Sequence, residues 1–164
     1  MIWPFSRRST LPDAAPLYAA LVAMARDPRW YREAGVADTM DGRFAVLASM
    51  VALADHRLGA GSDTARALSP RLTECFVADM DAQLQQAGLG DPTLGKQVRK
   101  LVAVLADKTV RLADPEDRDA VRRAIYADGH PDPDSLEKAA TFVADVRHRL
   151  AEASDDHLTQ GEIP

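Results

Sequence analysis

The stretch from Phe44 to Leu58 constrains the fold more than any other part of the chain. Apolar residues recur there at spacings of three and four, the repeat of an α-helix: Phe44, Leu47, Val51, Ala54 and Leu58. A second apolar stripe runs beside the first: Val46, Met50 and Leu53. The predicted helix is therefore apolar around most of its circumference. Such a helix is stable in water only when other helices surround it.

The rest of the chain shows the same helical periodicity, interrupted by glycine and proline. Apolar stripes predict helices over about 13–26, 72–87, 94–112, 115–126 and 136–150, with a short helical turn through Trp30 and Tyr31. No segment of useful length alternates apolar and polar residues as a half-buried strand does. We therefore predict an all-α fold, a single compact bundle of about six to seven helices without a sheet.

Length and composition limit the classes of protein to which the chain can belong. The 164 residues fit one domain better than two. We expect a flexible tail at 1–11, one helical domain over 12–153 and a frayed polar tail at 154–164. The single cysteine, Cys75, excludes an internal disulfide and a cysteine-based zinc cluster. The longest nearly unbroken apolar run, 44–54, falls well short of the ~20 residues of a membrane helix, so we expect a soluble, cytoplasmic protein.

The formal net charge of -5 hides two unlike parts. Residues 1–113 carry 14 Lys or Arg and 12 Asp or Glu, whereas residues 114–164 carry 6 and 13. The acidic total argues against a nucleic-acid partner. One face of the helix at 94–112 is nonetheless basic, with Lys96, Arg99, Lys100 and Arg111. This basic strip is either a solvated face or a contact surface for an acidic partner, an anionic membrane or RNA, and the acidic C-terminal segment can shield it.

Residues 90–96 match most of the sequence motif of a nucleotide-binding loop. The spacing of Gly90, Gly95 and Lys96 fits, but Gln97 stands where a Ser or Thr would bind magnesium. The genuine loop also follows a strand, and a helix is predicted here. A corner between two helices is therefore favoured, and nucleotide binding through Gly90–Lys96 is a remote alternative.

The carboxylates Asp79 and Asp81 do not predict a metal site, because residues two apart on a helix point about 200° apart. Asp79 falls at the edge of an apolar stripe and needs a partner. We expect Arg43, beside the predicted core, to pair with Asp79 or Asp81. No nucleophile has an obvious base nearby in the sequence, so we expect no catalytic residue, no metal, no cofactor and no enzymatic activity.

Two blocks of sequence resemble the ubiquinol–cytochrome c chaperone family. The first reads Pro28-x-Trp30-Tyr31-x-x-x-Gly35-Val36-x-Asp38-Thr39-x-Asp41-Gly42-Arg43-Phe44. The second contains Asp79-Met80-Asp81, Leu84, Gly88-Leu89-Gly90-Asp91 and Gly95-Lys96. The resemblance covers roughly residues 17–105, and the acidic helices at 114–153 lie outside it. The short length and missing presequence resemble the bacterial members.

The resemblance implies an all-helical, non-enzymatic assembly factor, peripheral to the inner membrane. Mitochondrial members of the family bind newly made cytochrome b and help to build ubiquinol–cytochrome c reductase, the respiratory cytochrome bc1 complex, together with a small partner protein. The alternative is a helical adaptor for another respiratory or membrane protein. The candidate partner-binding residues are the matched positions and two more from the basic strip: Asp38, Thr39, Asp41, Gly42, Arg43, Phe44, Asp79, Asp81, Gly90, Asp91, Lys96, Arg99 and Lys100.

Overall fold

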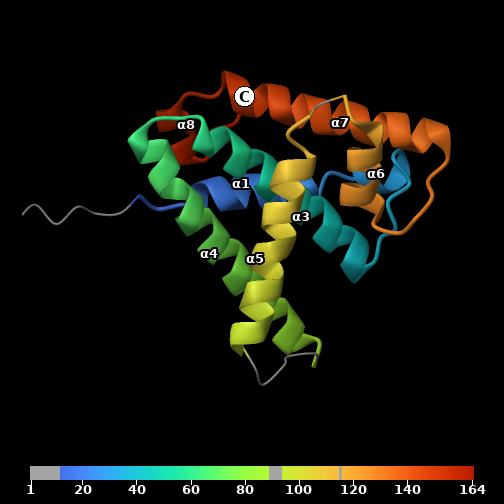
Figure 1. The fold of residues 1–164 in the computed structure, drawn as a ribbon, viewed down its shortest axis with the longest axis horizontal. Helices are drawn as coiled ribbons and strands as arrows, with labels where there is room; N and C mark the ends of the chain where they lie inside the picture. The colour runs from blue at the N-terminus through green and yellow to red at the C-terminus, as the bar shows by residue number, and fades with distance from the viewer. Residues whose placement is uncertain (1–11, 89–93, 115) are drawn as a thin grey trace, which may run out of the picture.

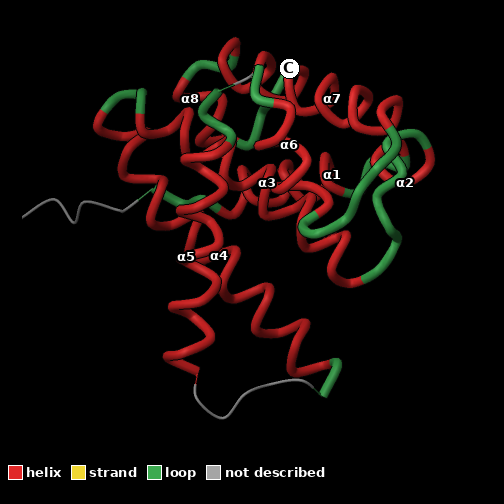
Figure 2. Tube along the Cα trace, turned by 45° about the vertical axis from the view of Figure 1, so that its right-hand side comes forward, coloured by secondary structure: helices red, strands yellow, loops and turns green. Residues whose placement is uncertain are grey.

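The fold consists of helices and their connections. The computed structural model describes residues 12–88, 94–114 and 116–164, and this part of the chain contains no strand (Figure 2). Its helices are α1 (Ala15–Ala25), α2 (Arg29–Arg32), α3 (Met40–Gly59), α4 (Asp63–Gln86), α5 (Leu94–Arg111), α6 (Arg118–Tyr126), α7 (Pro133–Glu152) and α8 (Asp155–Gln160). The all-α prediction is confirmed. The described residues form eight helices rather than six to seven, and α8 is the one that the sequence pattern does not predict.

Helix α3 is the centre of the bundle. Every residue from Ala45 to Ala54 is buried, and α3 contacts α1, α4, α5, α6 and α7. Ser49 is the one polar side chain in this run, and its hydroxyl donates to the Ala45 carbonyl at 2.7 Å, so its burial leaves no unpaired group. None of the described helices, α3 included, has both the length and the apolarity needed to cross a membrane.

Side-chain caps fix where five of the described helices begin: α3, α4, α6, α7 and α8. In each case a hydroxyl or carboxylate oxygen accepts a hydrogen bond from the backbone N–H three residues later, which satisfies a donor that the first turn leaves free. The capping residues are Thr39, Ser62, Asp117, Asp132 and Ser154. Thr39 caps the central helix α3.

Helices α4 and α5 run antiparallel and extend together beyond the rest of the bundle, while α7 lies across the opposite end (Figure 1). The C-terminal half of α5 is anchored to α6 by Lys108, whose buried ammonium donates to the Ala124 carbonyl. Burial lowers the pKa of Lys108 to about 8, because the charged form is deprived of water. Because this anchor holds the C-terminal half of α5, the start of α5 is its more exposed end.

In the described residues no acidic side chain of the C-terminal segment forms an ion pair with the basic strip, so the shielding considered for it is not seen there. The start of α5 points away from α7 (Figure 1). Acidic side chains of the segment pair instead with basic residues one helical turn away, as Asp119 does with Arg122 and Arg123 and Asp134 does with Lys138. Pairs at this spacing form within one helix and need no contact with the rest of the chain.

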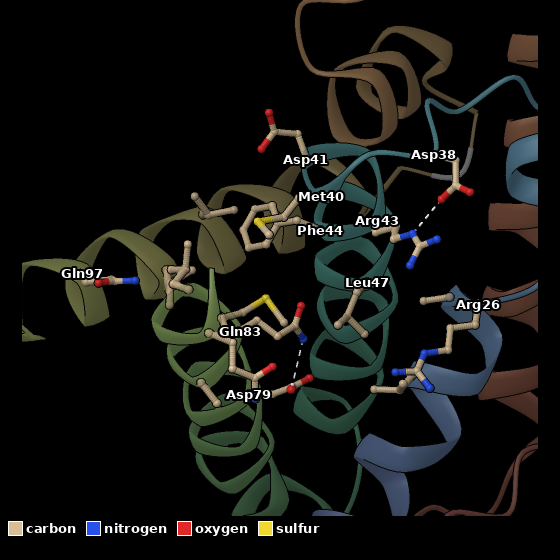
Figure 3. Close-up of a pocket in the computed structure, with 18 of the residues that line it drawn as sticks. Arg26, Asp38, Met40, Asp41, Arg43, Phe44, Leu47, Asp79, Gln83 and Gln97 are labelled. Carbon is tan, nitrogen blue, oxygen red and sulfur yellow. Dashed lines mark hydrogen bonds and ion pairs between the residues drawn. The ribbon is translucent and has the colours of Figure 1, made fainter. Parts of the chain in front are cut away.

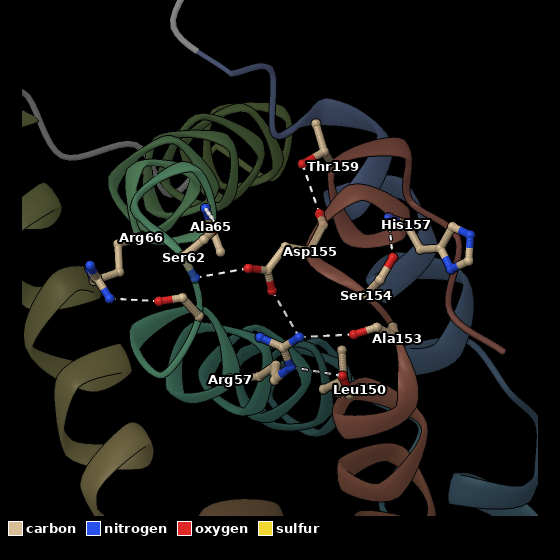
Figure 4. Close-up of polar contacts among 11 residues, drawn as sticks. Arg57, Ser62, Ala65, Arg66, Leu150, Ala153, Ser154, Asp155, His157 and Thr159 are labelled. Carbon is tan, nitrogen blue, oxygen red and sulfur yellow. Dashed lines mark hydrogen bonds and ion pairs between the residues drawn. The ribbon is translucent and has the colours of Figure 1, made fainter.

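The predicted frayed end at 154–164 is wrong. Helix α8 buries Leu158, which is 1% exposed, and contacts α1 and α4. The Asp155 carboxylate accepts from Arg57 at 2.9 Å and from the Ser62 backbone N–H at 2.8 Å (Figure 4). The same guanidinium donates to the carbonyls of Leu150 and Ala153. This network ties the C-terminus to the turn between α3 and α4.

Replacing Asp155 with Asn will destabilise the protein in a pH-dependent way. Hydrogen bonds from Ser62 and Arg57 lower the pKa of Asp155 to about 2 from its ordinary 3.8. Because the folded pKa lies below the unfolded one, the stabilisation is present above about pH 4 and is lost as the pH falls towards 2. A quarter of the side chain is exposed, so we expect the loss at pH 7 to be about 1 kcal/mol.

Urea unfolding of Asp155→Asn and the wild type at pH 7 and pH 3 checks this. The difference in unfolding free energy should shrink at pH 3. Asp156→Asn, on the exposed side of the same turn, should match the wild type at both values. An equal loss in both variants would contradict the assignment.

Candidate functional site

A groove of about 1330 Å³ opens between the end of α1, α2, the start of α3, the end of α4 and the start of α5 (Figure 3). Its apolar lining comes from four helices: Val22, Phe44, Leu47, Met80, Leu84, Leu101 and Val104. Charged residues also line it: Arg26, Arg32, Asp38, Asp41, Arg43, Asp79, Lys96 and Lys100. Seven of the sequence-predicted candidates therefore meet in one hollow, although they come from separate parts of the chain.

Gly42 sets how closely the start of α3 approaches the loop before it. A Cβ atom at this position would lie 1.9 Å from the carbonyl oxygen of Ala37, a distance that no side chain tolerates. The neighbouring Thr39 accepts from the Gly42 backbone N–H at 3.2 Å and caps the helix. Gly42 and Thr39 are thus explained by local structure, and they place Phe44 in the groove, against Phe76 at 5.9 Å between ring centroids.

Arg43 does not pair with Asp79 or Asp81, contrary to the prediction. It donates to Asp38 at 2.7 Å, and both side chains are more than half exposed. The hydrogen bond from Arg43 lowers the pKa of Asp38 below its usual value. The turn before α3 brings Asp38 and Arg43 together, although they are five residues apart. Sequence spacing alone does not predict this contact. An exposed pair of this kind adds little stability and stays available to a partner.

Asp79 has a tyrosine as its partner where an arginine was expected. The Tyr18 hydroxyl of α1 donates to Asp79 at 2.6 Å, and the Gln83 amide donates to it at 3.1 Å (Figure 3 shows Gln83). Burial, and next the hydrogen bond to Asp79, raise the pKa of Tyr18 above its ordinary value, so the phenol stays a neutral donor. Tyr18 is absent from the predicted site. The sequence does carry a signal for it: Tyr18, an aromatic residue with a hydroxyl group, lies beside the apolar stripe of α1.

Asp81 lies away from the groove, as its spacing from Asp79 predicts. It accepts from the Gln85 amide at 2.6 Å and is not among the residues that line the hollow. No group of three or more His, Cys, Asp or Glu in the described residues is placed to hold a metal ion. Gly90 and Asp91, and with them most of the loop considered for nucleotide binding, lie outside the described residues.

The basic strip is divided by the structure. Lys96 and Lys100 line the groove, whereas Arg99 projects from an exposed face and Arg111 pairs with Asp107 at 2.7 Å. Arg26 and Arg32 also line the groove, and sequence analysis missed them because nothing in their spacing links them to α5. In the described part of the chain none of these four groove cations has an ion-pair partner, so the rim is positively charged.

Comparisons with known proteins agree with the resemblance found in the two blocks. A family model described as "Ubiquinol-cytochrome C chaperone" matches residues 32–163. The match therefore extends through the acidic C-terminal segment, which the blocks left out. A crystal structure of the Cbp3 homolog from Brucella abortus has 29% sequence identity and a TM-score of 0.73, over 90% of this chain and 85% of that one. No curated protein matches the chain.

Replacing Gly42 with Ala will destabilise the fold by about 2 kcal/mol, because the first turn of α3 must move to relieve the contact with Ala37. Gly95→Ala is the matched control. A Cβ there meets only the end of the Arg99 side chain at 3.6 Å, and alanine is the better helix former, so stability should be unchanged or rise by up to ~1 kcal/mol. Thermal unfolding of both variants checks this, and similar effects would contradict the role given to Gly42.

Proposed function

Because this chain belongs to the ubiquinol–cytochrome c chaperone family, we propose that it assists the assembly of the cytochrome bc1 complex by binding newly made cytochrome b. The observation that carries the proposal is the family match over residues 32–163. The Cbp3 homolog supports it, since its similarity extends over most of both chains. The action proposed is binding and release, without catalysis.

The groove is the proposed client site. Its apolar lining offers a surface for the apolar face of a helix, and its charged rim offers partners for polar residues at the edge of that helix. Asp38, Asp41, Arg43, Phe44 and Asp79 belong to the two family-like blocks and all line it. Met40 also lines it and is 49% exposed, which is unusual for a large apolar side chain and suits a contact made only with a partner.

The proposed place of action is the cytoplasm beside the inner membrane. A membrane protein such as cytochrome b exposes apolar segments before assembly, and a positively charged rim suits a site close to anionic lipid headgroups. Lys96 and Lys100 at the start of α5 are exposed groove cations that suit such a contact. A small partner protein can take part at a second surface.

Photo-crosslinking from the groove tests the proposed client. We expect a benzoyl-phenylalanine at Met40 to crosslink to cytochrome b in cells, because this side chain lines the groove and is accessible. The same group at Ala144, exposed on α7 and outside the groove, is the control and should give no such product. Mass spectrometry of the adducts identifies the partner.

The crosslinking results distinguish the proposed function from the adaptor alternative and test the groove as the binding site. Cytochrome b captured from position 40 alone supports the proposal. Consistent capture of a different respiratory or membrane protein from that position supports the alternative, a helical adaptor with another client. Equal capture from positions 40 and 144, or no adduct from position 40, would contradict the groove as the binding site.

A further inference from the structure

The outward face of α5 is apolar, although nothing in the described residues covers it. Seven exposed residues follow one another along this face at helical spacing, and six of them are small or aliphatic: Gly95, Arg99, Val102, Ala103, Ala106, Val110 and Ala113. We call this set the outer stripe. Val110 is 76% exposed and Val102 42% exposed, and besides Met40 they are the large apolar residues most exposed in the described chain. An uncovered face of this kind is typical of an interaction surface.

Charge changes sign along the outer stripe. Lys96, Arg99 and Lys100 surround its start, and in the described residues they have no ion-pair partner. Asp114 and Glu116 follow its end and are likewise without one in that part of the chain. Asp107 and Arg111, between them, neutralise each other at 2.7 Å. The stripe is thus basic at one end and acidic at the other.

We propose that the outer stripe binds the outer stripe of a second copy of this chain, with the two α5 helices antiparallel. A twofold axis at Ala106 places Val102 of one copy opposite Val110 of the other, because the two lie four residues on either side of it. The same axis places Arg99 of one copy near Ala113 and Asp114 of the other. The basic end of each stripe then meets the acidic end of its partner, whereas a parallel pair would bring like charges together.

The small residues of the stripe suit this arrangement. Ala103 and Ala106 at the centre let two helix backbones approach closely, and the valines on either side fill the remaining space. The groove stays open in such a dimer, because Gln97, Leu101 and Val104 line it from the opposite side of α5. The dimer would therefore present two grooves, and Arg99, which does not line the groove, would meet the acidic end of the partner copy.

One helix pair buries less than the ~800 Å² per partner of a standard interface. The dimer should therefore dissociate on dilution. Sedimentation velocity on the full chain, from about 1 to 200 µM, should show monomers at the lower end and dimers at the upper end. A chain that remains monomeric throughout this range would overturn the proposal.

Substitutions locate the interface. Val110→Glu places a charge opposite Val102 and should weaken dimerisation at least tenfold. Ala144→Glu on α7 is the matched control and should leave dimerisation unchanged. Both positions are exposed, so both variants should keep the wild-type melting temperature. Dimerisation of Val110→Glu with wild-type affinity would overturn the assignment of this face.

A charge exchange tests the antiparallel orientation. Arg99→Glu should weaken the dimer, since it sets an acidic residue beside Asp114 of the other copy, and the double variant Arg99→Glu/Asp114→Arg should restore it. Restoration supports the antiparallel pairing. If the double variant is no tighter than Arg99→Glu while its circular dichroism is unchanged, the pairing is overturned.

Discussion

The burial of α3 is the constraint on which the rest of the structure depends. Ten consecutive residues of this helix, Ala45 to Ala54, are buried, so helices must cover it on every side. Each large aliphatic side chain in the run contributes roughly 1.5–3 kcal/mol when it leaves water. The five helices that contact α3 are held in place by that gain, and their order around it decides which surfaces stay open.

The open surfaces follow from this arrangement. Where α3 begins, its first turns are no longer enclosed, and the end of α4 and the start of α5 extend past them to form the groove. Gly42 lets the loop before α3 pass close to the helix, which places Phe44 inside and Arg43 at the rim. Helix α5 contributes one side to the groove and turns the opposite side outward, so one helix carries the basic rim residues and the outer stripe.

Periodicity was sufficient to predict the fold class and the main helices, because an apolar stripe must face a core whatever its neighbours are. The family-like blocks and the basic strip, rather than periodicity, supplied seven of the residues that line the groove. Partners were harder to predict. Asp79 meets Tyr18 and Arg43 meets Asp38 because α1 and the turn before α3 lie where only tertiary packing can place them. Helix α8 was missed because its six residues bury a single leucine, and the Arg57–Asp155 contact that holds it spans 98 positions of sequence.

The central claim is that the groove serves the assembly of the cytochrome bc1 complex. It is tested most directly by deleting the gene in the source organism and measuring the haem b absorbance and the amount of the complex in isolated membranes. We predict that both fall, and that wild-type protein or Ala144→Glu restores them whereas Met40→Glu, at the same cellular level, does not. Unchanged haem b and complex in the deletion strain, or full restoration by Met40→Glu, would contradict the account.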